Sequence, residues 1–364
     1  MKALIMAAGY GTRLEPLTIA VPKPMVPIVN IPTMQHNIEL LKAYGFDEIV
    51  ANIHYHPEQI ENYFGDGSAF GVNLAYSYEE NLLGTAGGVL KMAREIAHIE
   101  ETFVVLSSDA LTDINLSRLA AYHKEKKALV TLALLEVADV SQFGVVVQDE
   151  DGKIIAFQEK PNPKEAQSHF VNTGVYVMEP EVLKMIPGAP YDFGRQLFPQ
   201  LIKNSAPIYG YKMVEYWSDV GNLEQYMRSS YDAMQGRVRI RIPGKKVGSC
   251  TFIGEREQID SSARFEGSVI IGDRCLIGRE VIIKDSIIGD KCVIADGVRI
   301  EGSVIWSDNM IGREAQVNKA IIGNWCTVGS KAKISEGAVV ANRAIVSAGA
   351  IVPPKARLKP GEMV

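Results

Sequence analysis

The N-terminal stretch of this 364-residue chain carries the residue types that bind phosphate. A short apolar run over residues 2–8 is followed by Gly9 and Gly11, and Arg13 and Lys23 come soon after. Glycine lets the backbone turn tightly and approach a ligand, so backbone N–H groups in this loop can point at phosphate oxygens. Arginine adds a planar fork of donors that matches a phosphate, and lysine adds a compact positive charge. The stretch therefore predicts a site for a polyphosphate.

Two common glycine motifs do not fit this stretch. A dinucleotide-binding fingerprint needs a third glycine where Leu14 stands, and a Walker A loop needs Gly-Lys followed by Ser or Thr, which Gly11-Thr12-Arg13 does not provide. The residues thus indicate neither NAD binding nor ATPase chemistry. An ordinary strand-to-loop turn is the alternative for the two glycines alone, and the added cations favour phosphate binding over it.

An acidic residue follows a second apolar run that predicts a buried strand. The run covers residues 103–107, and Asp109 comes just after it, at the end of a strand where ligands bind in open α/β sheets. Magnesium prefers oxygen ligands and is usually shared with substrate phosphates, so Asp109 is a candidate Mg²⁺ ligand; a helix-capping role is the alternative. Asp113 lies nearby, but Asp-x-x-x-Asp lacks the Asp-x-Asp spacing of many glycosyltransferases, and we leave Asp113 out of the site.

Alternating strand-like and helix-like segments must position these residues. This alternation predicts a mostly parallel sheet covered by helices. We expect strands at residues 48–53, 72–76, 103–107, 129–135, 143–147, 154–157 and 171–176, and helices that begin near residues 33, 57, 85, 192 and 222. Asp192 is interpreted as a helix cap. Asp151-Gly152 between apolar runs predicts a β-hairpin, and its second strand leads to Glu159-Lys160-Pro161.

Length and composition set further bounds. A chain of 364 residues favours two domains, and a net charge of −5 with a pI near 5.8 gives no electrostatic footprint for nucleic acid. The sequence has no basic signal region and no apolar run of membrane-spanning length, so we expect a cytoplasmic protein without a membrane partner. The four cysteines lack CxxC spacing and nearby histidines, so we expect free, mostly buried thiols at Cys250, Cys275, Cys292 and Cys326.

The last third of the chain has a repeat of six residues. After a linker predicted at 236–250, a bulky apolar residue recurs every six positions, with occasional steps of five. The eighteen positions are Ile253, Ile259, Phe265, Ile271, Ile277, Ile283, Ile288, Ile294, Ile300, Ile305, Ile311, Val317, Ile322, Val328, Ile334, Val340, Val346 and Val352. This period is typical of a hexapeptide β-helix, in which three short strands form each coil and the periodic residue points inside. We predict about six coils over residues 251–364, with Cys275 and Cys292 stacked in adjacent coils.

Hexapeptide repeats also occur in many acyltransferases, whose usual chemistry needs a histidine between coils. All six histidines, which are His36, His54, His56, His98, His123 and His169, precede the repeat. This disfavours acyl transfer and leaves a structural, oligomer-forming or regulatory role for the β-helix. Trp306 and Trp325, beside periodic positions, are expected to face outward toward a partner subunit or the N-terminal domain.

The N-terminal motif also resembles the signature of a known family. The run Gly9-Tyr10-Gly11-Thr12-Arg13-Leu14-Glu15-Pro16-Leu17-Thr18, continued by Pro22-Lys23-Pro24, is similar to that of the sugar-1-phosphate nucleotidylyltransferases, or NDP-sugar pyrophosphorylases. The likeness is greatest to GDP-mannose pyrophosphorylases and related bacterial glucose-1-phosphate enzymes. It implies a Rossmann-like α/β catalytic domain of the glycosyltransferase-A type with a mostly parallel, mixed sheet over residues 1–235, followed by a left-handed parallel β-helix. It also implies that nucleotide is bound by Ala7, Ala8, Gly9, Gly11, Thr12, Arg13 and Lys23.

The resemblance continues to motifs that would bind the base and the metal. The loop that contains Gly84-Thr85 would lie against the base, and Glu79, five residues earlier, would accept hydrogen bonds from a base N–H edge. Helix capping and a solvated glutamate are the alternatives. Tyr216-Trp217-Ser218-Asp219 resembles the family's Trp-x-Asp-x-Gly motif, which implies that Asp219 and Asp109 both bind Mg²⁺ and that Asp109 also contacts the nucleotide.

The sugar phosphate would be bound by motifs in the middle of the chain. Phe157-Gln158-Glu159-Lys160-Pro161 resembles the family's Phe-Val-Glu-Lys-Pro, in which the glutamate accepts from sugar hydroxyls and the lysine binds the sugar phosphate. The strand with Asn172 resembles the family's Asn-x-Gly strand. With Gly144 and Asp219, these residues complete the implied sugar-phosphate site. Gln158 in place of the common valine leaves the identity of the sugar open.

These features together predict the reaction of an NTP with a sugar 1-phosphate to give an NDP-sugar and pyrophosphate. Arg13, Lys23 and Lys160 are the expected catalytic cations, because the main obstacle is the approach of one anion to another. The resemblance favours GTP with mannose 1-phosphate, while UTP or dTTP with glucose 1-phosphate stays open. A non-catalytic paralogue that senses nucleotide sugars is a further alternative; a plain sugar transferase is disfavoured by the phosphate loop. We expect a homo-oligomer that involves the β-helix.

Overall fold

The computed structural model describes residues 2–248 and 250–364. Met1, in the predicted N-terminal domain, and Ser249, in the predicted linker 236–250, lie outside the described residues. The chain forms two compact units: unit 1 contains residues 1–10 and 33–219, and unit 2 contains residues 11–32 and 220–364. In this grouping by contacts, residues 11–32 and 220–235 belong to the same unit as the β-helix.

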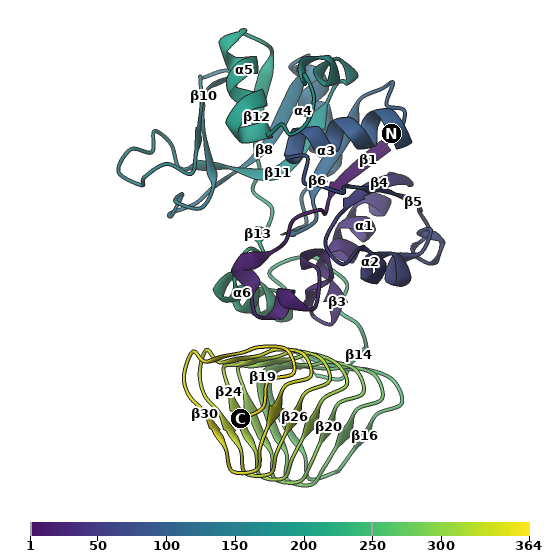
Figure 1. Ribbon diagram of the computed structural model, residues 1–364, viewed down its shortest axis with the longest axis vertical. Coiled ribbons are helices and arrows are strands. Elements are labelled where there is room, and N and C mark those ends of the chain that lie inside the picture. Colours follow the sequence, from purple (N-terminus) through teal and green to yellow (C-terminus); the bar gives the residue numbers. More distant parts are fainter. Residues whose placement is uncertain (1, 249) are drawn as a thin grey trace. The chain divides into compact units, whose positions relative to one another are not determined.

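Unit 1 is built on a nine-stranded mixed sheet (Figure 1). Its main path runs through β10 (Ile154–Glu159), β9 (Gly144–Gln148), β11 (Phe170–Met178), β6 (Phe103–Ser107), β1 (Lys2–Met6), β4 (Glu48–Ile53) and β5 (Asn73–Tyr78), and β8 (Val130–Glu136) pairs with β11 and with β12 (Ile208–Lys212). Strands β6, β1, β4 and β5 are parallel, whereas β11 runs antiparallel to β6, β8 and β9. The predicted mixed α/β sheet is confirmed.

The N-terminal strand β1 lies in the middle of this sheet. Its residues Ala3, Leu4 and Ile5 are fully buried, as expected for an apolar run covered on both faces. From β1 the chain passes to β4 on one side and later returns to β6 on the other side. This reversal is a topological switch point, where open α/β sheets bind ligands at the carboxyl ends of their strands.

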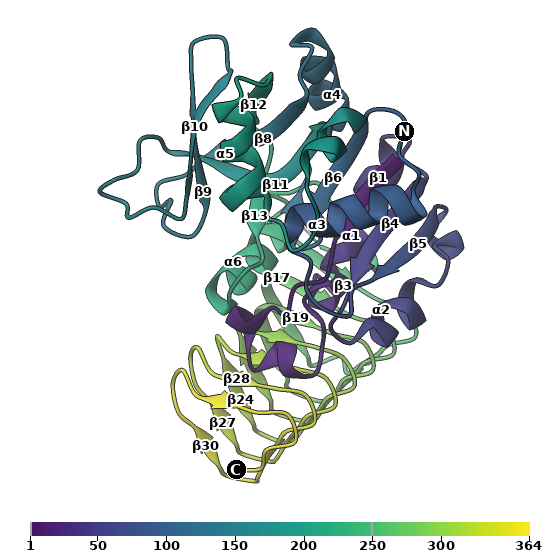
Figure 2. The same cartoon turned by 45° about the horizontal axis from the view of Figure 1, so that its top comes forward.

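Helices cover the sheet. They are α1 (Thr33–Ala43), α2 (Pro57–Phe64), α3 (Thr85–Lys91), α4 (Leu116–Glu125) and α5 (Phe198–Lys203), with shorter helical turns at Ser68–Phe70, Met92–Ile96, Pro180–Met185 and Phe193–Leu197. On α1 the predicted apolar face of Met34, Ile38 and Leu41 is buried, and α3 packs on β1, as Figure 2 shows. A two-stranded ribbon of β7 (Ala110–Thr112) and β13 (Trp217–Asp219) extends from the sheet.

Unit 2 contains the predicted β-helix, which has three faces. One face has β15 (Thr251–Ile253), the ends of β17 (Arg264–Ile271) and β19 (Ile282–Ile288), β22 (Val304–Ile305), β25 (Ile321–Ile322), β28 (Val339–Val340) and β31 (Arg357–Leu358). The second face has β16 (Gln258–Ile259), β18 (Leu276–Ile277), β20 (Val293–Ile294), β23 (Met310–Ile311), β26 (Thr327–Val328) and β29 (Ile345–Val346). The third has the starts of β17 and β19, then β21 (Arg299–Glu301), β24 (Gln316–Asn318), β27 (Lys333–Ile334) and β30 (Ile351–Val352).

All eighteen periodic residues lie on these strands and form one continuous core. Strand pairing stacks Ile277 on Ile294 and Ile294 on Ile311, so each of these coils advances by seventeen residues. Cys275 and Cys292 stack as predicted, and all four cysteines are free, with only Cys250 partly exposed. One further position, Leu358, continues the repeat six residues after Val352 and is also buried.

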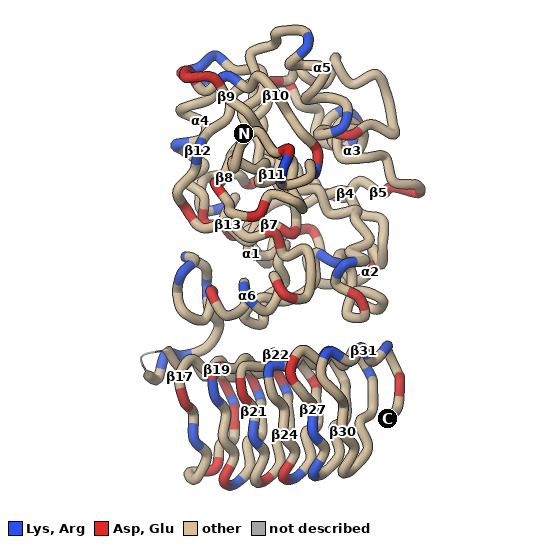
Figure 3. Tube along the Cα trace, turned by 90° about the vertical axis from the view of Figure 1, so that its left-hand side faces the viewer, with Lys and Arg blue, Asp and Glu red and all other residues tan. Residues whose placement is uncertain are grey.

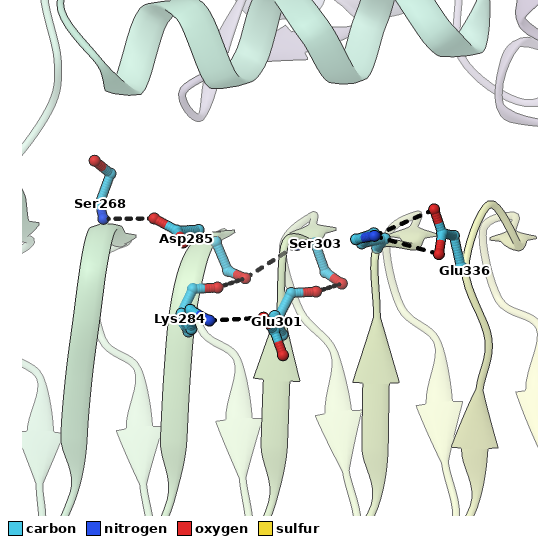
Figure 4. Close-up of polar contacts among 8 residues, drawn as sticks. Ser268, Lys284, Asp285, Glu301, Ser303 and Glu336 are labelled. Carbon is cyan, nitrogen blue, oxygen red and sulfur yellow. Dashed lines mark hydrogen bonds and ion pairs between the residues drawn. The ribbon is translucent and has the colours of Figure 1, made fainter.

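Charged and small polar side chains connect the coils on the outside. Figure 3 shows acidic and basic residues that recur from coil to coil. Lys284 Nζ lies 2.9 Å from Glu301 Oε1, and the Ser303 N–H donates to Ser286 Oγ on the neighbouring coil (Figure 4). Such exposed ion pairs contribute little stability each, about 0–1 kcal/mol. The apolar interior is therefore the main source of stability in this repeat.

The rest of unit 2 is small. It contains the hairpin of β2 (Pro27–Ile28) and β3 (Ile31–Pro32), helix α6 (Leu223–Met234), strand β14 (Lys245–Lys246), and 3-10 turns at Thr12–Leu14, Leu17–Ile19 and Lys23–Met25. Among residues 2–248 and 250–364, no helix is long and apolar enough to cross a membrane.

Candidate active site

The carboxyl end of β1 is fixed by the neighbouring strands of unit 1. The Ala7 N–H donates to Asn52 Oδ1 on β4 at 2.7 Å, and the Ser108 N–H after β6 donates to the Met6 carbonyl at 3.0 Å. Ala7 and Ala8 are buried, whereas Gly9, which follows them, is exposed. The first half of the predicted phosphate loop is therefore a rigid strand end that leads into an open turn.

Glu79 lies beside this strand end, after β5, and is only 5% exposed. Its Oε1 accepts from Asn52 Nδ2 at 2.6 Å, and its Oε2 accepts from the Leu83 N–H at 2.9 Å. Gly88 on α3 is packed against it, since a Cβ there would lie 2.5 Å from Glu79 Oε1. The carboxylate thus connects the end of β4, the loop before α3 and α3 itself.

Gly84 and Thr85 begin α3 and contact a distant loop. Gly84 has φ +73°, and a Cβ at this position would lie 2.5 Å from the Tyr191 carbonyl oxygen. That carbonyl accepts from the N–H groups of Ala86 and Gly87, and Thr85 Oγ1 accepts from the Phe193 N–H at 2.8 Å. The N–H groups at the start of α3 are paired with the backbone of the 191–193 loop, so two segments about a hundred residues apart in sequence are connected.

The two aspartates predicted to bind a metal are brought together by the β7–β13 ribbon. In this antiparallel pair Asp219 lies opposite Ala110, which is the neighbour of Asp109. Asp109 Oδ1 accepts a hydrogen bond from Ser107 Oγ, and Asp109 is half-buried. Asp113 Oδ1 accepts from the Tyr216 N–H at 2.9 Å, so Asp113 fixes the other end of the ribbon.

These carboxylates fit a hard cation, since Mg²⁺ takes oxygen ligands from one or two carboxylates and from substrate phosphates. The structure holds no cluster of three or more His, Cys, Asp or Glu side chains with metal-binding geometry among the residues it describes.

A cavity of about 380 Å³ brings the predicted sugar-phosphate residues together. Its lining residues come from the ends of β10 and β11, from the start of α3 and from the turn before α5. They are Thr85, Glu159, Lys160, Asn172, Tyr176, Asp192, Phe193, Gly194 and Arg195. Two basic side chains, Lys160 and Arg195, therefore face one small polar cavity, as a bound phosphate requires.

Glu159 is exposed as a residue, but its carboxylate lies close to two glycines that border this cavity. Its pKa is raised, chiefly by burial, although the positive charge of Lys160 acts in the opposite direction. Two glycines make room for its carboxylate: a Cβ at Gly194 would lie 2.5 Å from Glu159 Oε2, and a Cβ at Gly144 would lie 3.2 Å from the same atom. Gly144 is thus a spacer next to Glu159, its partner in the β9–β10 ladder.

Lys160 follows Glu159 in an unusual backbone conformation. Its φ is +48°, a left-handed value that is uncommon for a residue with a side chain, and its N–H donates to the Phe143 carbonyl at 3.1 Å. Strained conformations of this kind concentrate at functional sites, where the surroundings hold them in place. The turn brings Glu159 and Lys160 to the same cavity, although successive residues of a regular strand point to opposite faces.

Asn172 and Asp192 have partners that fix their orientation. Asn172 Nδ2 donates to the Tyr176 hydroxyl at 2.9 Å, and Asn172 Oδ1 accepts from the Gly174 N–H. Asp192 accepts from the N–H groups of Gly194 and Arg195, which confirms that it caps the helical turn. It also lines the cavity, a placement that the sequence did not indicate.

Gln158 faces away from this chemistry. Its Nε2 donates to the Glu165 carbonyl at 3.1 Å, and its Oε1 accepts from the Gln167 N–H at 2.9 Å. Gln158 therefore closes the 160–167 loop and does not line the cavity. Its difference from valine carries no information about the sugar.

The remaining predicted residues lie in unit 2. Gly11 has φ +71°, and a Cβ there would lie 2.9 Å from Lys23 Cβ, so the glycine turn and Lys23 are in direct contact. Thr18 Oγ1 donates to the Gly11 carbonyl at 2.9 Å and closes the same loop. Arg13 is exposed on the turn Thr12–Leu14. Unit 2 thus presents Thr12, Arg13 and Lys23 together.

The structure adds five cavity residues that the sequence did not assign to the site: Tyr176, Asp192, Phe193, Gly194 and Arg195. Arg195 had a detectable signal. A basic residue in the first turn of a helix opposes the helix dipole, which favours acidic residues there. An arginine three positions after a capping aspartate therefore gains nothing from the helix dipole, and this was the one local signal that the sequence offered.

Comparisons with known proteins show the family to which the chain belongs. A family model described as "Nucleotidyl transferase" matches residues 2–236, and one described as "EIF2B subunit epsilon LbH domain" matches residues 249–352. The chain is 39% identical to a UTP–glucose-1-phosphate uridylyltransferase of Synechocystis sp. over 319 residues. This match covers 79% of the present chain and 82% of that protein. It is 33% identical over 287 residues to a mannose-1-phosphate guanylyltransferase of Mycobacterium tuberculosis, with 74% and 79% covered. A solved UDP-glucose pyrophosphorylase in complex with UDP-glucose has a TM-score of 0.57 at 25% identity and covers 65% of this chain and 98% of that one.

Proposed function

Because the chain belongs to the nucleotidyl transferase family, we propose that it transfers a nucleotidyl group from GTP to mannose 1-phosphate, giving GDP-mannose and pyrophosphate. The observation that carries this proposal is the single cavity lined by Glu159, Lys160, Asn172 and Arg195. It offers two cations for the phosphate together with a carboxylate and an amide for sugar hydroxyls. These are the groups that a sugar 1-phosphate needs.

In this mechanism, charge compensation does most of the work. Lys160 and Arg195 bind the incoming phosphate, and Arg13 and Lys23 bind the triphosphate and its leaving pyrophosphate. The attacking phosphate oxygen is already anionic at neutral pH, so no residue has to remove a proton from it. The protein lowers the barrier by aligning two anions and by placing fixed positive charge around them.

The family chemistry also needs a divalent cation, and we propose Mg²⁺ held by Asp109 and Asp219. The support is their adjacency in the β7–β13 ribbon and the preference of Mg²⁺ for carboxylate and phosphate oxygens. When bound, the ion would supply further compensation of phosphate charge. Ser107, which donates to Asp109 Oδ1, orients this carboxylate.

Glu79 supports guanine as the base. A carboxylate only accepts hydrogen bonds and has about four lone-pair sites, of which Asn52 and Leu83 use two. Guanine presents two adjacent donors, N1–H and the N2 amino group, whereas uracil presents one N–H flanked by carbonyl oxygens that a carboxylate repels. A glutamate next to the base would therefore prefer GTP to UTP.

UTP with glucose 1-phosphate is the second candidate, because the Synechocystis relative at 39% identity is named for that reaction. A matrix of GTP, UTP, dTTP, ATP and CTP against mannose and glucose 1-phosphates, read by pyrophosphate release, separates the two. We expect the highest kcat/KM for GTP with mannose 1-phosphate. Binding without turnover for every pair would instead indicate a sensor of nucleotide sugars.

The Glu79→Gln variant tests the assignment of the base. A glutamine offers one acceptor and one donor, which suits uracil better than guanine, so the ratio of kcat/KM for GTP to that for UTP should fall by about tenfold or more. Glu80→Gln is the matched control, because Glu80 is the exposed neighbour in the same loop. An unchanged ratio in Glu79→Gln would contradict base recognition by this residue.

We further propose that the protein works in the cytoplasm and forms a homo-oligomer, a dimer or larger, through its β-helix. Residues 1–235 would form the catalytic domain and residues 251–364 the β-helix domain, joined by the linker 236–250. The support for self-association is a row of exposed apolar side chains on one face of the β-helix, among them Leu276, Met310 and Ile345.

A further inference from the structure

The segment that carries Arg13 and Lys23 ends in a strained hairpin. The turn between β2 and β3 consists of Val29 and Asn30, with φ values of +47° and +66°. Two positive φ values make a type I′ turn, for which Asn is suited and the β-branched Val is not. Such a conformation persists only where the surroundings impose it. Val29 is 1% exposed, so its surroundings are close-packed.

The β-helix supplies part of those surroundings. Asn30 Nδ2 donates to the Ile288 carbonyl on β19 at 2.8 Å, and β2 contacts α6. On α6, the Tyr226 hydroxyl accepts from Trp306 Nε1 at 2.7 Å, next to β22. At the end of α6, Gln235 Nε2 donates to Ser268 Oγ at 2.8 Å; Ser268 is labelled at the edge of the coils in Figure 4.

The hydrogen bond between Trp306 and Tyr226 is protected from water. Tyr226 is fully buried and Trp306 is 2% exposed, and their rings meet edge to face with centroids 6.4 Å apart. Trp306 thus faces outward from the β-helix, as the sequence predicts, but it packs against α6. Trp325, which is 51% exposed, is open to solvent. A buried hydrogen bond between two large rings is a specific connection, because loss of one partner leaves the other unsatisfied.

The face of the β-helix that contains β22 is also shielded from solvent. Residues that alternate with the core positions on this face point away from the coil interior, yet they are at most 5% exposed: Ile270, Ile287, Val304, Ile321 and Val339. At the equivalent outward positions of the second face, Leu276, Met310 and Ile345 are 37–57% exposed, and Val293 between them is intermediate. The bonds of Asn30, Tyr226 and Gln235 identify the hairpin and α6 as part of this cover.

We infer that the β-helix is a positioning element for the phosphate-binding segment: through Trp306 with Tyr226 and through Ile288 with Asn30 it fixes residues 11–32, which carry Arg13 and Lys23. The inference rests on the proposed function, in which these cations bind the triphosphate. Trp306 and Asn30 touch no substrate in it and are positioning residues. Fixed charges stabilise a transition state best when they need no reorganisation, so a loosened segment should bind NTP less well.

The test uses the full-length protein with Trp306→Phe and, separately, Tyr226→Phe. Each variant removes one partner of the same hydrogen bond and keeps an aromatic ring. We expect the KM for NTP to rise about threefold to tenfold and the KM for sugar 1-phosphate to change by less than about twofold. Deuterium uptake in peptides from residues 11–32 should become faster, and the double variant should be no worse than either single variant.

Two further variants keep the inference falsifiable. Trp325→Phe is the matched control, because Trp325 is an exposed tryptophan of the same β-helix, and it should change neither KM nor deuterium uptake. Asn30→Gly removes the bond to Ile288 but keeps a residue suited to positive φ, so it should reproduce the effect if Trp306→Phe fails to fold.

The two readouts separate the inference from the proposed function. Unchanged deuterium uptake in residues 11–32, in folded Trp306→Phe or Asn30→Gly, overturns the positioning role even if thermal stability falls. Faster uptake supports the positioning role whatever the kinetics. Faster uptake together with an unchanged KM for NTP would count against the assignment of Arg13 and Lys23 to the triphosphate.

Discussion

At the scale of single residues, Asp109 is the side chain whose loss should be most costly. Asp109→Ala removes a carboxylate from the proposed Mg²⁺ site, and loss of preorganised charge compensation typically lowers kcat by about a hundredfold or more. The measurement is pyrophosphate release as a function of Mg²⁺ concentration, in which the remaining activity should need more Mg²⁺. Asp113→Asn is the control, because Asp113 Oδ1 accepts from the Tyr216 N–H and faces the backbone; it should lower stability but leave the Mg²⁺ dependence unchanged. Full turnover in Asp109→Ala would remove Asp109 from the site.

A second prediction at this scale is that the ionised carboxylate of Glu159 lowers the stability of the folded protein. Burial raises its pKa above the ordinary value of 4.5, so the native state binds this proton more tightly than the unfolded chain does. Ionisation of Glu159 therefore costs stability once the pH exceeds about 4.5, and the cost grows until the pH passes the folded pKa. Because Glu159 is also exposed to solvent, which weakens the effect, Glu159→Gln should raise the melting temperature at pH 7 only slightly and abolish activity, and the stability difference should vanish below about pH 4.5.

A pair of melting curves at pH 7 and pH 4 measures this effect. Glu150→Gln, at the exposed tip of the same hairpin, is the control and should show no difference at either pH. A melting temperature at pH 7 that is equal to or below that of the wild type would show that Glu159 is compensated by its neighbours.

The sequence reached most of this residue-level chemistry but not all of it. Glu159, Lys160 and Asn172 were found through motifs, and the structure brings them to one cavity. Arg195 and Tyr176 were missed, because their places in the cavity depend on how α5 packs beside β10 and β11. Such packing brings together residues that no local pattern connects.

At the scale of elements, we predict that Gly194, in the first turn after Asp192, leaves the room that the Glu159 carboxylate needs in the proposed sugar site. Gly194→Ala adds a Cβ that would lie 2.5 Å from Glu159 Oε2, so the carboxylate has to move. We expect the KM for sugar 1-phosphate to rise by about tenfold and the KM for NTP to stay within about twofold, since Arg13 and Lys23 are on another element. Gly188→Ala is the matched control, because no atom lies within 4 Å of a Cβ at that position. Equal effects of Gly194→Ala on both KM values would show a general distortion instead.

The repeat was the element that the sequence predicted best. All eighteen periodic positions lie on β-helix strands, because a period of six residues repeated that often leaves little freedom for another fold. Leu358 was missed at the end, where one more step of six follows Val352. The hairpin tip at Val29 was not predictable at all, since a valine with positive φ opposes local preference and is held by packing.

At the scale of the whole molecule, each compact unit is formed by two segments that are separated in the sequence. Residues 11–32 lie more than 200 positions before the β-helix, yet they belong to the same compact unit. Composition and motifs divide a chain only into consecutive pieces, so the sequence assigned this segment to the N-terminal domain. Contacts such as that of Asn30 with Ile288 group the segment with the β-helix, and they leave no pattern in a single sequence.

The last prediction concerns self-association through the second face of the β-helix. Leu276, Met310 and Ile345 point outward there and are 41%, 57% and 37% exposed, so burying them against a second copy would remove apolar surface from water.

In a two-fold symmetric pair each substitution occurs twice, so Leu276→Lys with Met310→Lys would place four unpaired positive charges in the interface. We expect this variant to sediment as a monomer at micromolar concentration with unchanged pyrophosphate release, because neither residue is among those that line the cavity. Ile351→Lys is the control: Ile351 is 68% exposed and lies on the third face, so this substitution should leave the assembly intact. A wild-type protein that sediments as a monomer, or a doubly substituted one that still assembles, would show that this face is not the interface.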